Sequence, residues 1–130
     1  MTTDKDGNLV FKAVFKEQNE TFLFTKENYD KHCKKHSRLK FDKYLEEIEK
    51  ALMDPDRVTK GPNEGKRTFY KVVKIINPKF NTYVEVWQVP TFNKGKLFNI
   101  ISTAYTFWSP SWRVIHHLEE KIWEKENSLI

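Results

Sequence analysis

The chain has 130 residues, of which 23 are Lys or Arg and 18 are Asp or Glu, so its net charge is +5 at neutral pH. This length predicts one domain, residues 1–130, whose core needs no disulfide. The single cysteine, Cys33, excludes an internal disulfide and a cysteine-based zinc site. No stretch has the apolar character of a signal peptide or the length of a membrane span, so we expect a cytoplasmic protein without membrane contact.

The N-terminal residues predict a hairpin followed by a helix. Apolar and polar residues alternate over residues 9–15, and an aromatic-rich run covers residues 21–25, with a turn expected at residues 17–20. Thr25 is a suitable N-cap for a helix that extends from residue 26 to about residue 36.

This first helix is basic and carries two histidines, His32 and His36, on one helical face. Six Lys or Arg residues stand against one acid between positions 31 and 43, and seven stand against one acid between positions 57 and 79. Acidic stretches separate and follow the two basic ones, so the basic stretches can converge into one positive face that binds a polyanion. The alternative is that these charges only solvate the surface.

A second helix is expected over residues 41–53, because its apolar residues recur at the spacing of an amphipathic core helix. The sequence Asp54-Pro55-Asp56 ends it. The loop that follows is rich in turn-forming residues, and its length would allow it to close over a ligand. Its turn formers are Gly61, Pro62, Asn63 and Gly65.

The C-terminal half predicts three strands and a last helix. The strands cover residues 67–76, 81–89 and 96–107, and their short connections favour an antiparallel meander. Ser109 and Pro110 are suited to start a helix whose apolar stripe continues to Trp123. The expected fold class is therefore α+β, with an N-terminal hairpin, two helices packed on a four- to five-stranded antiparallel sheet, and a C-terminal helix.

The order of these features resembles the barnase, EndoU, colicin and RelE-like (BECR) nuclease superfamily, particularly its phage- and polymorphic-toxin-associated branch. The resemblance covers about residues 32–107. It rests on the histidine-bearing helix, on a second helix that ends in a Leu-x-x-Pro-x-x-Val element, and on two strand motifs. These motifs are Phe69-Tyr70-Lys71 and Ser102-Thr103-Ala104-Tyr105. The resemblance implies a metal-independent ribonuclease domain with this α+β fold, often deployed as a toxin and paired with an immunity or antitoxin protein.

The resemblance also implies roles for individual residues. His36 is the leading general acid or base and His32 the second, while Lys71 would neutralise the phosphorane. Thr103 and Tyr105 would orient the phosphate or shuttle a proton. We expect further phosphate or RNA contacts from Lys35, Arg38, Ser102 and, on its position in the strand alone, Arg67.

Each of these residues also has a structural interpretation. A histidine on a helix stripe can be a hydrogen-bonded boundary residue, a strand lysine can protect a sheet edge, and Thr103 and Tyr105 are ordinary β-formers. His32 and His36 have the spacing of zinc ligands, but Cys33 stands where the hydrolase motif needs glutamate, so we expect no metal and no cofactor.

The expected function is a metal-independent, toxin-type endoribonuclease that cleaves RNA by attack of the 2′-hydroxyl, leaving a 2′,3′-cyclic phosphate. Two histidines suit this chemistry because an ordinary pKa of about 6.5 lets one imidazole be neutral and another protonated. RNA is the expected partner, together with an immunity or antitoxin protein, in a cytoplasm into which a larger toxin would deliver the domain. The alternative is a non-catalytic RNA- or protein-binding module of a phage or toxin system.

Overall fold

The computed structural model describes residues 1–35, 41–61, 64–76, 83–95, 98–109 and 120–124. These residues form two helices and nine strands. The helices are α1 (Lys26–Lys35) and α2 (Phe41–Met53), and the strands are β1 (Thr2–Thr3), β2 (Leu9–Phe15), β3 (Gln18–Phe24), β4 (Arg57–Lys60), β5 (Lys66–Ile76), β6 (Tyr83–Lys94), β7 (Phe98–Ile101), β8 (Tyr105–Ser109) and β9 (Glu120–Glu124).

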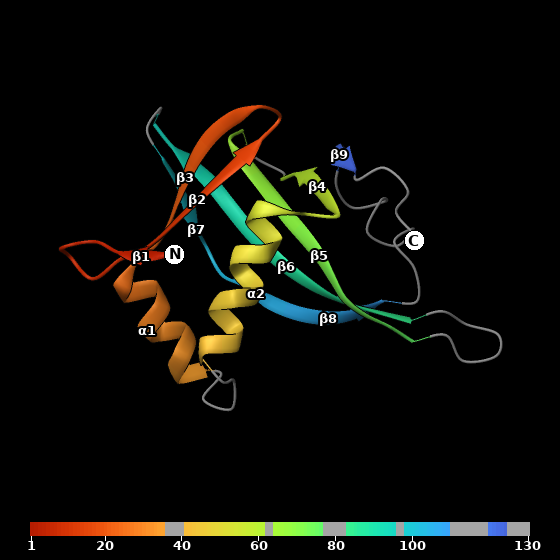
Figure 1. The fold of residues 1–130 in the computed structure, drawn as a ribbon, viewed down its shortest axis with the longest axis horizontal. Helices are drawn as coiled ribbons and strands as arrows, with labels where there is room; N and C mark the ends of the chain where they lie inside the picture. The colour runs from red at the N-terminus through yellow and green to blue at the C-terminus, as the bar shows by residue number, and fades with distance from the viewer. Residues whose placement is uncertain (36–40, 62–63, 77–82, 96–97, 110–119, 125–130) are drawn as a thin grey trace.

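The nine described strands belong to one sheet, in the order β1-β2-β3-β7-β6-β5-β4-β9, with β8 on the same edge of β6 as β7. Every pairing is antiparallel except that of β3 with β7. Helix α2 packs on β2, β5 and β6, and Figure 1 shows it crossing one face of the sheet. The α+β class is therefore confirmed, whereas the expectation of four or five strands is wrong.

Helix α2 has the predicted bounds, because its apolar spacing produces a single buried stripe. Tyr44, Ile48 and Leu52 are buried, and Lys50 on the opposite face pairs with Glu46 at 3.4 Å. The helix ends before Pro55, as the sequence predicts, because a residue that precedes proline disfavours the helical conformation. Neither described helix has the length and apolar character of a membrane span.

The hairpin of β2 and β3 has a tighter turn than expected. Lys16 and Glu17 form the two-residue turn, both with positive φ angles, of 49° and 67°. A two-residue turn with two positive φ angles has a twist that matches the right-handed twist of the flanking strands, so β3 begins directly after it, at Gln18. The turn expected at residues 17–20 is thus shorter, and most of it belongs to a strand.

The core lies between α2 and the curved sheet and is rich in aromatic rings that meet edge to face. The Phe15 and Phe22 rings lie 5.7 and 5.4 Å from that of Phe69, and Phe15 also meets Trp123 at 6.0 Å. These contacts bring β2, β3, β5 and β9 together around one cluster, and such pairs contribute beyond the apolar area that they bury.

Two further predictions, for residues 57–60 and 120–124, are wrong. Residues 120–124 form β9, not the end of a helix, because the edge of β4 offers backbone partners and Trp123 packs on the core; residues 110–119 lie outside the described part. Residues 57–60, expected in a loop, form β4 as the partner of β5.

The third expected strand is interrupted. Its first part, β7, pairs with residues 91–94 of β6, and its second part, β8, pairs with residues 84–88 of the same strand. Between them Ser102, Thr103 and Ala104 leave the ladder, although the Ser102 amide still donates to the Pro90 carbonyl at 2.9 Å. This break between β7 and β8 forms the candidate site.

Candidate functional site

Helix α1 positions the imidazole of His32. The Thr25 hydroxyl caps the helix by accepting the Asn28 amide at 3.2 Å, as predicted. Tyr29 packs edge to face on Phe24 with ring centroids 5.5 Å apart, and His32, one turn later, lies 6.1 Å from the same Phe24 ring. The helix face that carries His32 therefore packs against β3, and the imidazole is only partly exposed.

The imidazole meets the break between β7 and β8. Nδ1 of His32 lies 3.3 Å from the Thr103 hydroxyl, although the two residues are 71 positions apart in the chain. Ala104, next to Thr103, is completely buried and anchors the segment in the core. The fold thus brings together a basic nitrogen and a hydroxyl that the sequence analysis had named separately.

Tyr44 of α2 completes this cluster. Its hydroxyl donates to the Ala104 carbonyl at 2.6 Å and also contacts Nε2 of His32. Only 3% of Tyr44 is exposed, and its ring meets Trp87 edge to face at 4.9 Å. Burial, with smaller contributions from the nearby Cys33 and Tyr29, raises the pKa of the Tyr44 hydroxyl far above its usual value, so the group stays protonated.

Sequence reasoning missed the polar role of Tyr44, which the helical spacing assigned to the apolar stripe of α2. The one available signal was that a buried tyrosine hydroxyl requires a hydrogen-bond partner. Spacing alone does not reveal that the partners come from α1 and from the segment after β7.

Of the other site residues predicted next to His32 and Thr103 in the sequence, the structure describes the side chains of Ser102 and Tyr105 only. His36 and Arg38 lie outside the described residues, as does the side chain of Lys35. Ser102 is exposed beside Thr103, and Tyr105, at the start of β8, is 38% exposed opposite Gln88 of β6. Ser102 and Tyr105 thus flank the segment of Thr103 and Ala104 and are exposed.

Lys71 is not brought to this cluster. Its ammonium donates to the carbonyl and the carboxylate of Asp54, at 2.8 and 3.0 Å, and lies 4.0 Å from Asp56. Asp54 follows the last turn of α2, whereas Tyr44 lies in the first; at 1.5 Å per residue these positions are about 15 Å apart. Lys71 therefore fixes the far end of α2 to β5.

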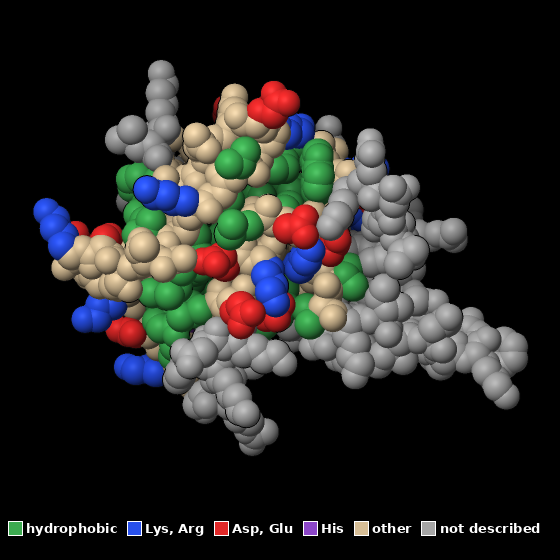
Figure 2. All heavy atoms as spheres, in the orientation of Figure 1, with side chains coloured by type: hydrophobic (Ala, Val, Ile, Leu, Met, Phe, Trp, Pro, Cys, Tyr) green, Lys and Arg blue, Asp and Glu red, His purple; other side chains and the backbone are tan. Residues whose placement is uncertain are grey.

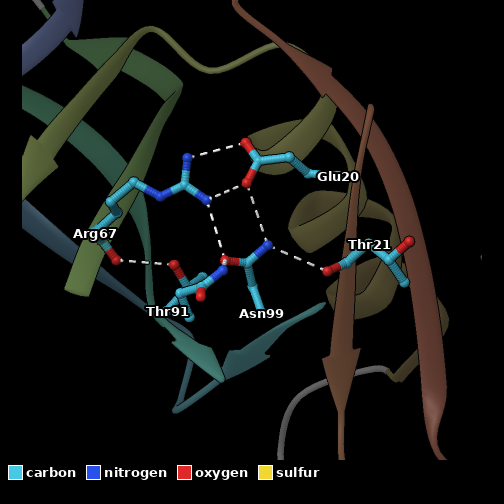
Figure 3. Close-up of polar contacts among 6 residues, drawn as sticks. Glu20, Thr21, Arg67, Thr91 and Asn99 are labelled. Carbon is cyan, nitrogen blue, oxygen red and sulfur yellow. Dashed lines mark hydrogen bonds and ion pairs between the residues drawn. The ribbon is translucent and has the colours of Figure 1, made fainter. Parts of the chain in front are cut away.

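Arg67 is also engaged elsewhere (Figure 3). Its guanidinium binds Glu20 through two hydrogen bonds, at 2.9 and 2.6 Å, and donates to Asn99 at 3.2 Å. It also lies over the rings of three phenylalanines, Phe15, Phe22 and Phe69. These contacts join β5 to β3 and β7 and leave Arg67 with a structural role in the described protein.

Ion pairs also involve three of the seven basic residues in the second basic stretch, residues 57–79. Arg57 binds Glu124, Arg67 binds Glu20, and Lys71 binds Asp54. On the face shown in Figure 2, acidic and basic side chains of the described residues are interspersed. Among the described residues of this stretch, Arg57, Arg67 and Lys71 are therefore bound to acidic partners, whereas Lys79 and the side chain of Lys74 lie outside the described part.

Among the described residues, no three histidine, cysteine or acidic side chains gather as a metal site would require. The chemistry available at the cluster of His32, Tyr44 and Thr103 is proton transfer and hydrogen bonding. Comparisons of the chain with family models, with curated proteins and with solved structures gave no match.

Proposed function

We propose that this chain is a metal-independent, toxin-type endoribonuclease. The observation that carries the proposal is the contact between Nδ1 of His32 and the Thr103 hydroxyl, at 3.3 Å. These two residues belong to two of the features that carry the resemblance to BECR nucleases, the histidine-bearing helix and the Ser-Thr-Ala-Tyr motif. Their meeting supports the resemblance because histidine and hydroxyl side chains must converge for this chemistry.

The proposed reaction is an internal transesterification of RNA. Neutral His32 accepts the proton of the 2′-hydroxyl, and the 2′-oxygen attacks the adjacent phosphorus. The bond from phosphorus to the 5′-oxygen then breaks, and the departing oxygen takes a proton from an acid. The products are a 2′,3′-cyclic phosphate and a 5′-hydroxyl, with no change in oxidation state.

The neighbouring side chains have matching roles in this proposal. When RNA binds, the 2′-hydroxyl replaces the Thr103 hydroxyl as the hydrogen-bond donor to Nδ1. The Thr103 hydroxyl then donates to a non-bridging phosphate oxygen and stabilises the negative charge that develops there. In this proposal, Ser102 and Tyr105 contact the same phosphate or an adjoining nucleotide, as the resemblance implies for Tyr105. His36 remains the proposed acid on the strength of the resemblance, since it lies outside the described residues.

The BECR-like fold belongs to the same proposal. It is supported by the order of the histidine-bearing helix, the second helix with Leu52 and Pro55 at its end, and the break that carries Thr103. An immunity or antitoxin protein as partner, and action in the cytoplasm, follow from the resemblance. The cluster around His32 supplies the residues by which these proposals are tested.

Cleavage of total RNA in the presence of EDTA tests the function. We expect fragments with cyclic-phosphate ends, and we expect His32→Gln to lower the rate by about 10²- to 10⁴-fold, the usual contribution of a general base. The matched control is Lys31→Gln, which removes an exposed cation from the same helix and should retain the rate at saturating RNA.

Two outcomes would contradict the proposal. Wild-type protein that binds RNA without cleaving it would favour the non-catalytic binding module. Cleavage at an unchanged rate by a folded His32→Gln variant would remove the imidazole, and the site described above, from the reaction.

A further inference from the structure

The Tyr44 hydroxyl makes two contacts but has a single hydrogen. It lies 2.6 Å from the carbonyl oxygen of Ala104, which can only accept, so the hydrogen is directed to that oxygen. The second contact joins the same hydroxyl oxygen to Nε2 of His32. A hydrogen bond there requires the hydrogen to come from the nitrogen, and Nε2 must therefore be protonated.

The other ring nitrogen follows from this assignment. A neutral imidazole has one N–H group, so when Nε2 carries the hydrogen, Nδ1 has a lone pair and acts as a hydrogen-bond acceptor. The Thr103 hydroxyl, 3.3 Å away, can then donate to Nδ1. The opposite tautomer would set the electron pair of Nε2 against the Tyr44 oxygen with no hydrogen between them.

From this hydrogen-bond order we propose that Tyr44 is a positioning residue, which holds neutral His32 as the Nε2–H tautomer and so presents Nδ1 to the Thr103 side. In terms of catalysis, which rests on the proposed function, Nδ1 is the atom that accepts the 2′-hydroxyl proton. The buried Tyr44 touches no RNA; it acts through His32.

The tautomer can be measured without any substrate. Nitrogen-15 NMR of the imidazole rings, at about pH 9 where an ordinary histidine is neutral, distinguishes the two forms, and His32→Gln identifies the signal. We expect the wild-type protein to show the Nε2–H form of His32. Tyr44→Phe removes only the hydroxyl, so both tautomers should become populated and the cleavage rate should fall roughly tenfold, the effect of one lost hydrogen bond.

Tyr70→Phe is the matched control, because it removes another buried tyrosine hydroxyl, whose partner is Thr59. It should leave the tautomer of His32 and the cleavage rate unchanged. A general loss of stability would affect both variants, whereas the tautomer should respond to Tyr44 alone.

The possible failures are separable. Wild-type His32 in the Nδ1–H form, or the same tautomer population in Tyr44→Phe as in the wild type, would overturn the inference. Wild-type protein with the Nε2–H form and no ribonuclease activity would overturn the proposed function while confirming the hydrogen-bond order.

Discussion

At the scale of single residues, removing the hydroxyl of Thr103 tests most directly whether the cluster of His32, Tyr44 and Thr103 takes part in RNA cleavage. Thr103→Val preserves the shape of the side chain and removes its hydrogen bond to His32. We expect RNA cleavage to slow about tenfold or more, since one such bond of about 1.4 kcal/mol corresponds to a factor of ten. Thr2→Val, which makes the same change at an exposed position of β1, is the control and should retain the rate.

Arg67 allows a prediction on stability. Arg67→Met leaves the partly buried Glu20 without its two strongest donors, and we expect the free energy of unfolding to fall by about 1–3 kcal/mol. Urea denaturation measures this change, with Lys66→Met at the exposed neighbouring position as the control. A stable Arg67→Met variant with weakened RNA binding would instead restore the phosphate contact expected from the sequence.

These residues show what could be predicted from sequence at this scale. Residue types and motifs identified His32 and Thr103, because imidazole and hydroxyl groups are few and chemically distinctive. They could not identify the partner of a charge, so Arg67 was expected at phosphate although Glu20 lies within reach in the folded chain. A polar partner depends on tertiary distance, which spacing along one strand does not contain.

At the scale of elements, Lys71 connects the end of α2 to β5. Its ammonium binds a carbonyl at the C-terminal end of the helix, where a cation is favoured by the helix dipole. We expect Lys71→Met to lower the free energy of unfolding by about 1 kcal/mol and to leave RNA cleavage unchanged.

The salt dependence of RNA binding shows whether Lys71 has this structural role or contacts phosphate. A lysine that contacts phosphate contributes to the slope of log affinity against log salt, by about 0.7 for single-stranded RNA. Equal slopes for Lys71→Met and wild type support the structural role. A shallower slope in the variant would show that Lys71 contacts phosphate and belongs to the RNA-binding surface.

Elements with strong periodicity were predicted well, and those formed by pairing were not. Helix α2 and strand β2 have the predicted bounds, since each shows one clear apolar face. Strands β4 and β9 are short, and they exist because each finds an edge to pair with. The residues of β9 follow the spacing of a helix equally well, so local pattern alone favoured the wrong element.

At the scale of the whole molecule, the ion pair of Arg57 with Glu124 attaches the last described strand to the sheet. Partial burial raises the pKa of Glu124, but hydrogen bonds from Arg57 and Lys121 outweigh it and hold that pKa below its usual value of 4.5. A lowered pKa stabilises the folded state above the unfolded-state pKa, and this contribution is lost as the pH falls through the folded-state value.

The corresponding prediction is a stability difference that depends on pH. Because Arg57 is only 1% exposed, Glu124→Gln should cost about 1–3 kcal/mol at neutral pH. The difference from wild type should shrink as the pH falls below 4.5 and through the lowered pKa of Glu124. Thermal unfolding at a series of pH values measures it. The control Glu27→Gln removes an exposed pair with Lys31 and should change little at any pH. A constant difference for Glu124→Gln would contradict the pairing.

The strand order is the part of the fold that the sequence predicted least. A meander was expected because the connections are short, and β5, β6 and the two parts of the third strand, β7 and β8, do form one. The parallel pairing of β3 with β7 joins residues far apart in the chain, and no local signal indicates such a pairing. The site depends on it, because this pairing helps to set α1, which follows β3, next to the break after β7.

A consequence for the timing of activity follows from the distance in sequence between His32 and Thr103. A ribosome must add 71 residues after His32 before both members of the pair exist, and a protease that cuts between them leaves the two on separate fragments. On the proposed function, the producing cell is therefore protected from its own nascent chains. On the same proposal, two fragments that carry His32 and Thr103 separately are each inactive as ribonucleases, and they would cleave RNA only after they reassociate.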